Sequence, residues 1–370
     1  MFTSLTQHIT DPRQYPATPP GNELLRHASM ILNATGAADK SLSASELQAA
    51  INRMLAEDHF LGLSVALSMV PNQATYQTIW QGLNKSLVPQ NEQQVQWFAL
   101  PIIVVVGTQQ EANLNPQTPV AAINECFKSH DVTANTDAIH WHPELLSATN
   151  LSAIKASQWY QAKESANAAQ AMLEALPASV LYAPQGQSVE VVYALGYTKE
   201  ANTLTLGSAL RQAALPLMQV FNEHFKQAGC TIFANPLPPY PVFNAMVEGG
   251  KMRLQMALDV FAGNAIRAVR LQSGRVGVVI APQEGGNLMF TFNATESNYG
   301  LPEQVFAWPL SPLDNMELIL QNFLELLVEC QVEHVRLCQD IVPLDANMPT
   351  YEEALKLNSV NPLTQEKLLS

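Results

Sequence analysis

The chain has 370 residues, of which 47% are hydrophobic and 14% are charged, and its formal net charge is -13. This length predicts two or three domains, and the hydrophobic fraction excludes wholesale disorder. The strongly negative charge disfavours general binding to nucleic acid or to an anionic membrane.

The first part of the chain predicts a flexible arm followed by a helical region. Residues 1–21 are polar and proline-rich, which is typical of a mobile arm. Ser43 and Glu46 have the spacing of a capping box, which predicts that a helix begins there. Further helical sequence follows to about residue 87, so region 22–92 is expected to be all-helical.

The sequence changes character at WFALPIIVVVGT, residues 97–108. A continuous apolar run rich in Ile and Val predicts a strand buried on both faces. An α/β subdomain is therefore expected over 93–240, closed by the rigid segment LPPYP. Its further helices are predicted near Cys126 and over 150–176 and 208–228, and its further strands at VEVVYALGYT, NTLTL and CTIFANP.

Residues 241–342 predict an α+β subdomain. The residue types of MRLQMALDVF favour a helix, although its apolar positions alternate. The segment AIRAVRLQSGRVGVVIAP is expected to form a β-hairpin with Ser273 and Gly274 as a two-residue turn. LMFTFNAT predicts a third strand of this meander, and a helix over 313–331 leads to the strand EHVRLCQDIVP.

Residues 343–370 are predicted to be a short C-terminal tail. Within it, MPTYEEALKL has a capping box before a short amphipathic helix, which can dock on its own domain or on a partner. The two predicted units of helix and strand, beginning at 208 and 313, follow one plan and represent either an internal duplication or two ordinary units. The expected fold class is α+β, with a helical N-terminal region followed by mixed α/β subdomains, a β-hairpin or meander, and this tail.

Basic residues cluster in the predicted hairpin region. Residues 249–283 hold five cations and one acid, a net charge of +4, whereas residues 284–370 hold three cations and thirteen acids, a net charge of -10. Three interpretations remain open for the cluster: charge satisfied within the protein or by solvent, binding to an acidic protein partner, and binding to a phosphorylated ligand or nucleic acid. On the predicted hairpin Arg267 lies on the opposite face from Arg270 and Arg275, so no continuous stripe forms and nucleic acid binding is not expected. The candidate residues for binding a partner or an anion are Lys251, Arg253, Arg267, Arg270 and Arg275.

One candidate metal site is present, at His140, His142 and Glu144. A His-x-His pair on a strand places both imidazoles on one side, and a carboxylate can complete a zinc or iron site. The alternative is a polar loop without metal, because Pro143 interrupts strand pairing.

The sequence contains no GxxxxGK[ST], GxGxxG, GxSxG, HExxH or CxxC motif, so no cofactor is expected. Four scattered cysteines indicate reduced thiols, and the N-terminal residues do not resemble a signal peptide, which together predict a cytoplasmic protein without membrane insertion. We expect a non-catalytic structural or adaptor subunit of a larger bacterial assembly, such as a secretion or transfer machine. It would contact other protein subunits through the arm and the tail. The alternative is an enzyme or small-molecule-binding protein whose site is assembled from distant residues.

Overall fold

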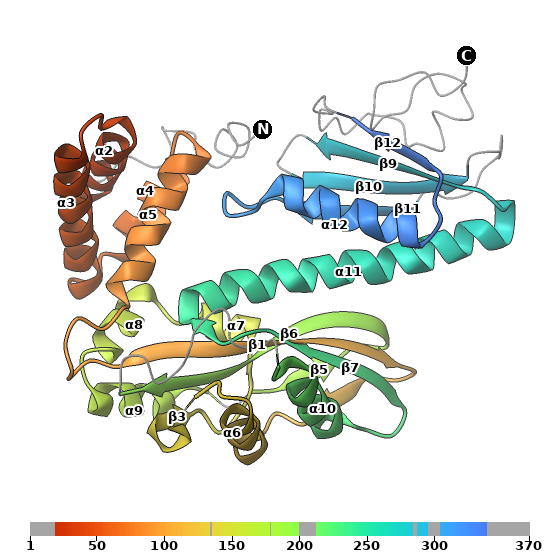
Figure 1. Ribbon diagram of the computed structural model, residues 1–370, viewed down its shortest axis with the longest axis horizontal. Helices are drawn as coiled ribbons and strands as arrows, with labels where there is room; N and C mark the ends of the chain where they lie inside the picture. Colours follow the sequence, from red (N-terminus) through yellow and green to blue (C-terminus); the bar gives the residue numbers. More distant parts are fainter. Residues whose placement is uncertain are drawn as a thin grey trace. The chain divides into compact units, whose positions relative to one another are not determined.

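The computed structural model has an α+β fold, as predicted, and divides into two compact units (Figure 1). The N-terminal unit comprises residues 17–67 and 77–253, and the C-terminal unit comprises residues 1–16, 68–76 and 254–370. The predicted tail, the predicted strand NTLTL and nearly all of the predicted arm lie outside the described residues. The structure describes residues 19–133, 135–177, 179–199, 212–283, 287–294 and 304–338.

In the described residues before the first strand there are four helices, which confirms the predicted helical sequence. They are α2 (Pro19–Asn33), α3 (Ala37–Ala56), α4 (Phe60–Ser68) and α5 (Gln73–Ser86). The predicted capping box at Ser43 is wrong, because α3 begins six residues earlier, after an extended Gly36, and Ser43 is buried inside the helix.

A six-stranded sheet is the centre of the N-terminal unit, and its long strand is the predicted apolar run. β1 (Gln96–Thr108) pairs along all 13 of its residues with β6 (Gly186–Thr198), in antiparallel register from Gln96 and Thr198 to Thr108 and Gly186. The main strand order is β3-β6-β1-β7, with β4 also paired to β6 and β8 to β1. These strands are β3 (Ile139–Trp141), β4 (Leu146–Ser147), β7 (Cys230–Pro236) and β8 (Tyr240–Pro241), while β2 (Ala112–Leu114) and β5 (Leu181–Ala183) form a separate pair and η1 (Thr136–Ala138) is a short 3-10 helix.

Both faces of this sheet are covered. Alternate residues of β1, such as Phe98 and Ile102, pack in one core cluster with α6 (Val120–Ser129) and α10 (Ala214–Phe225). On β1 the neighbouring residue Trp97 meets Trp159 edge to face, with ring centroids 5.1 Å apart. Two-sided coverage explains why the strand is apolar at nearly every position.

The helix predicted over 150–176 is wrong as a single element. Three short helices take its place: α7 (Ala148–Ser152), α8 (Ala156–Ala162) and α9 (Ala166–Ala175). Each of the three helices has a local start signal. Ser147 and Ser165 accept hydrogen bonds from the backbone N–H groups of Asn150 and Ala168, which starts α7 and α9. At the start of α8 the backbone N–H of Lys155 donates to the Gln158 side chain at 2.9 Å.

In the described part of the C-terminal unit, two helices pack on a four-stranded sheet of order β11-β10-β9-β12, and the first of them, α11, belongs to this unit from Leu254 onward. Its first helix, α11, contributes Leu258, Ala262 and Ile266 to the core, and its second helix, α12, contributes Phe323 and Leu327. The elements are α11 (Val242–Ser273), β9 (Val276–Gln283), β10 (Asn287–Ala294), β11 (Gln304–Pro309), α12 (Met316–Glu329) and β12 (His334–Leu337).

The predicted hairpin turn at Ser273 and Gly274 is wrong, because residues 265–273 are the last part of α11. Ala265, Ile266 and Val269 are buried at helical spacing, and Ala, Arg, Leu and Gln all favour helix. Gly274 then ends the helix with φ of +81°, and its N–H donates to the carbonyl of Arg270. β9 pairs instead with β10 and β12. Although α11 has 32 residues, no helix in the described ranges is long and apolar enough to cross a membrane.

The two helix-to-strand segments that are predicted to follow one plan pair with their sheets in different directions. β7 follows α10 and is antiparallel to β1, whereas β12 follows α12 and is parallel to β9. This difference in pairing favours two ordinary units over an internal duplication.

Two adjacent glycines in α11 give a test of how closely this helix approaches the sheet. A Cβ on Gly249 would lie 2.7 Å from Tyr193 Oη and 3.1 Å from Val191 Cγ2, whereas a Cβ on Gly250 would meet nothing within 4 Å. We expect Gly250→Ala to raise the free energy of unfolding by up to about 1 kcal/mol, because alanine favours helix. We expect Gly249→Ala to lower the free energy of unfolding by about 1–3 kcal/mol. Tyr193 is itself buried, and the cost of overpacking against it exceeds the gain in helix propensity. Urea unfolding of both variants measures the difference, and equal effects would contradict the close packing.

Candidate functional site

The five candidate basic residues are divided between the two units. Lys251 and Arg253 belong to the N-terminal unit, and the three other arginines belong to the C-terminal unit. Lys251 pairs with Glu248 at 3.2 Å. Arg253 donates from Nε to the carbonyl of Val189 at 2.9 Å and lies 3.6 Å from the Glu190 carboxylate.

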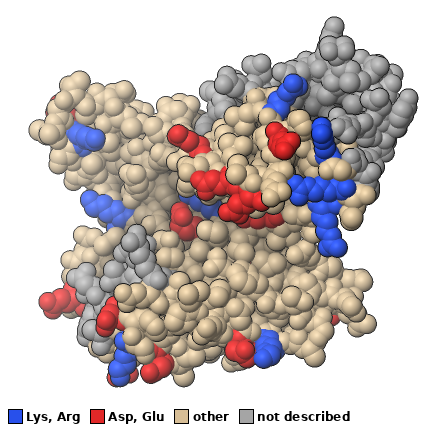
Figure 2. All heavy atoms as spheres, turned by 45° about the vertical axis from the view of Figure 1, so that its right-hand side comes forward, with Lys and Arg blue, Asp and Glu red and all other residues tan. Residues whose placement is uncertain are grey.

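Arg270 makes a structural contact with the C-terminal end of α12. Its guanidinium donates to the backbone carbonyl of Cys330, which caps the C-terminal end of α12, and to that of Gln331 at 3.1 Å. These are carbonyls that the end of a helix leaves without partners, and a cation there also interacts favourably with the helix dipole. Arg267 and Arg275 are both exposed. In Figure 2, acidic side chains gather near the middle of the view, and a group of basic side chains lies directly beside them on the right.

The three candidate metal ligands have separate surroundings. His140 lies in β3 and stacks on Tyr197, with ring centroids 4.8 Å apart and planes 15° from parallel. Burial lowers the pKa of His140, and the charge of Lys199 acts in the same direction. His142 is 3% exposed and contacts the backbone of Glu144 through Nδ1. Among the described residues, no three His, Cys, Asp or Glu side chains come close enough to hold a metal ion.

The clearest unsatisfied surface is the outer side of α12. Nine of its 14 residues are apolar, and they do not all face the sheet: Met316, Leu318, Ile319, Leu320, Phe323, Leu324, Leu326, Leu327 and Val328. Ile319, Phe323 and Leu327 are buried in the core. Leu318 and Val328 are 52% and 75% exposed. A helix that is apolar on more than one side is normally buried on more than one side.

Part of this outer side forms a groove of about 670 Å³ with β12, which we call the α12 groove. It is lined by Glu317, Leu320, Gln321, Leu324, Glu325, Val328, Glu329 and Leu337. Leu320, Leu324 and Val328 follow one another at four-residue spacing and form an apolar stripe. Leu337 adds apolar surface from β12, where it is 49% exposed.

The charge of the α12 groove is entirely negative, since three of its lining residues are glutamates and none is Lys or Arg. Glu317 lies in the first turn of α12, where the helix dipole favours an acid. Glu329 is the last residue of the helix, whose final turn has no basic residue, and an acid there is unfavourable. Helix stability therefore does not account for the presence of Glu329 at the C-terminal end of α12.

The sequence analysis did not single out this surface, although the sequence carries a signal for it. Leu318, Ile319 and Leu320 are adjacent, as are Leu326, Leu327 and Val328. Three adjacent residues of a helix span about 200° of its circumference, so they cannot all point into one core. Runs of this kind in an otherwise amphipathic helix indicate a second apolar face.

The chain matches no protein-family model, no curated protein and no solved structure.

The Arg270 contact can be tested against its neighbour Arg267, which is exposed on the same helix. We expect Arg270→Ala to lower the free energy of unfolding by about 1 kcal/mol, because two helix-end carbonyls lose a charged donor at an exposed position. Arg267→Ala is expected to have a smaller effect. Hydrogen exchange should become faster in the last turn of α12 only in the Arg270 variant. If exchange there is unchanged, Arg270 does not hold the end of the helix.

Proposed function

We propose that this protein is a non-catalytic adaptor subunit that holds a partner protein in the α12 groove. The observation that supports this proposal most directly is the second apolar side of α12, with Val328 75% exposed beside three glutamates. Exposed apolar surface rimmed by polar residues marks interaction sites on soluble proteins. The ends of α12 are fixed by Asn315, which accepts a hydrogen bond from the N–H of Leu318, and by Arg270.

The partner segment that fits this surface is an amphipathic helix with apolar residues on one side and Lys or Arg beside them. The stripe of Leu320, Leu324 and Val328 presents a ridge at four-residue spacing, which packs into the grooves of another helix. The span from Glu317 to Glu329 is about 18 Å, or a little over three helical turns. Basic side chains of the partner would meet carboxylates that no lining cation neutralises.

Two other occupants are less well supported by the charges. A second copy of this chain would bring two sets of three glutamates together, and like charges oppose such an interface. A nucleic acid would meet the same carboxylates with its phosphates. The cytoplasmic location, the bacterial assembly, and the contacts made by the arm and the tail stay predictions from the sequence.

A defined probe tests this proposal without knowledge of the natural partner. We expect a synthetic amphipathic helix of leucine and lysine to bind the full chain, and its counterpart of leucine and glutamate not to bind. Affinity for the lysine helix should fall as salt is raised, because exposed charges are screened. Calorimetric titration with both peptides measures the preference.

Matched variants locate the binding surface. Val328→Ser is expected to weaken binding of the lysine helix about tenfold, as loss of a central apolar contact does. Leu271→Ser is the control, because Leu271 is 78% exposed on α11 and lies outside the groove. If both variants bind alike, or if the glutamate helix binds as well as the lysine helix, the groove is not the docking site. A stable dimer that Val328→Ser dissociates would assign the surface to a second copy.

A further inference from the structure

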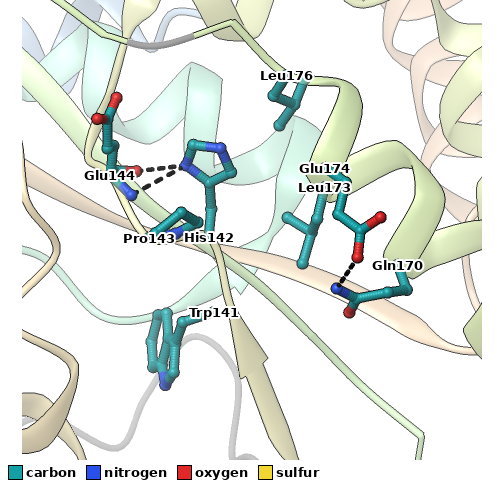
Figure 3. A pocket seen from close by; sticks show the side chains of 8 residues that line it. All are labelled: Trp141, His142, Pro143, Glu144, Gln170, Leu173, Glu174 and Leu176. Carbon is teal, nitrogen blue, oxygen red and sulfur yellow. Dashed lines mark hydrogen bonds between the residues drawn. The ribbon is translucent and has the colours of Figure 1, made fainter.

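A second pocket lies in the N-terminal unit, between the connection from β3 to β4 and helix α9 (Figure 3). Its volume is about 360 Å³. The β3–β4 connection contributes Trp141, His142, Pro143 and Glu144, and α9 with the residue after it contributes Gln170, Leu173, Glu174 and Leu176. We call it the His142 pocket.

His142 is held in one orientation by its backbone and by one ring nitrogen. Its N–H donates to the carbonyl of Leu195 at 2.9 Å, which continues the pairing of β3 with β6. Its Nδ1 lies 2.7 Å from the carbonyl oxygen of Glu144 and 3.2 Å from the N–H nitrogen of the same residue. The two contacts need opposite tautomers, since the carbonyl accepts from a protonated Nδ1 and the Glu144 N–H donates to an unprotonated one. We assign the proton to Nδ1, because the contact with the carbonyl is the shorter.

This tautomer leaves a lone pair on Nε2 of the neutral imidazole. Figure 3 shows that Nε2 points away from Glu144, toward the side of the pocket on which Leu173 and Leu176 lie. The hydrogen-bond contacts of the ring with described residues are made through Nδ1, and Nε2 is not one of the fully enclosed polar atoms, so it faces the open pocket. In this tautomer the pocket therefore presents an oriented acceptor to a ligand.

The other polar groups of the pocket also favour a cationic donor. Two carboxylates line it and no Lys or Arg does. Glu144 accepts on Oε2 from the N–H of Ser179 at 2.7 Å and on Oε1 from the Gln117 amide at 3.4 Å, and its carboxylate points away from the His142 ring (Figure 3). Glu174 is exposed and accepts from the Gln170 amide at 2.8 Å, which leaves its carboxylate with further accepting capacity. Leu173, Leu176 and Pro143 provide apolar walls beside these acceptors.

We infer that the His142 pocket binds an organic cation with N–H donors on an apolar stem, such as an alkylammonium group. The ammonium donates to His142 Nε2 and to the Glu174 carboxylate, and the stem contacts the leucines. A metal ion fits less well, because no three potential ligands among the described residues converge here. The ammonium group can come from a small amine or from a lysine side chain of a partner, and the two sources share this chemistry.

The first test uses n-butylammonium, with n-butanol and butyrate as probes of the same stem without the cation. Binding is followed by long-range ¹H–¹⁵N NMR of the histidine rings. We expect the spectrum of the free protein to show His142 protonated on Nδ1, and only butylammonium to shift its Nε2 signal. Equal shifts from butanol or butyrate, or a proton on Nε2 in the free protein, would overturn the proposal.

Three variants assign the contacts. His142→Asn keeps a short donor near the Nδ1 position and removes Nε2, and it should weaken butylammonium binding about tenfold. Glu174→Gln should weaken it about fivefold, as expected for a partly solvated ion pair. Glu223→Gln is the control, since Glu223 is an exposed glutamate of α10 outside the pocket. If Glu174→Gln binds as the control does, the cation does not occupy this pocket.

The source of the ammonium group is distinguished by one further ligand. Nα-acetyl-lysine amide carries the same charged group on a peptide unit. Tighter binding of this ligand than of butylammonium assigns the pocket to a lysine of a partner protein, and weaker binding assigns it to a free amine. The groove variant Val328→Ser should leave the affinities for butylammonium and for Nα-acetyl-lysine amide unchanged. The proposal for the His142 pocket can therefore fail without the proposal for the α12 groove, and the reverse.

Discussion

The N-terminal unit depends on the burial of β1 from both sides. Because nearly every residue from Trp97 to Val104 is buried, each face of the strand needs its own cover. Helices α6 and α10 cover one face. On the other, α11 comes so close to Tyr193 that only a glycine fits at position 249. The pairing of β3 with β6 at the edge of this sheet also positions His142, whose backbone N–H donates to the carbonyl of Leu195. The pocket therefore lies where the pairing of β3 with β6 stops.

The C-terminal unit shows a different constraint, because α12 is apolar on two sides and only one of them can face its own sheet. A helix with this composition needs its ends held if it is to stay ordered while one side is open. Asn315 holds the first turn, and the Asp314 carboxylate accepts from the N–H of Ser311 at 2.8 Å and from the indole of Trp308 at 3.3 Å. Arg270 holds the last turn from α11. A surface fixed in this way loses less conformational entropy on binding, which favours its use as an interface.

The sequence predicts an element correctly where one physical signal dominates. The fold class, β1 and α12 were predictable, because a continuous Ile/Val run and a long amphipathic pattern each have one good structural solution. Residues 265–273 carried two conflicting signals, and helix propensity with core spacing prevailed over the apparent turn at Gly274. His140, His142 and Glu144 are predicted from the sequence as a candidate metal site. Glu174, which lines one pocket with His142 and Glu144, lies thirty residues further along the chain, and no local pattern connects it with them.

The placement of the cations explains why both candidate sites are acidic. Charged residues are only 14% of the chain, and acids outnumber Lys and Arg by 32 to 19. Several of the few cations bind backbone carbonyls: Lys163, which is 3% exposed, donates to Ser86 at the end of α5, Arg253 to Val189 and Arg270 to Cys330. A cation used as a helix cap or strand contact is not available to neutralise a surface carboxylate. The glutamates of the α12 groove and of the His142 pocket have no Lys or Arg among the lining residues, and for this reason we propose a cationic partner for each surface.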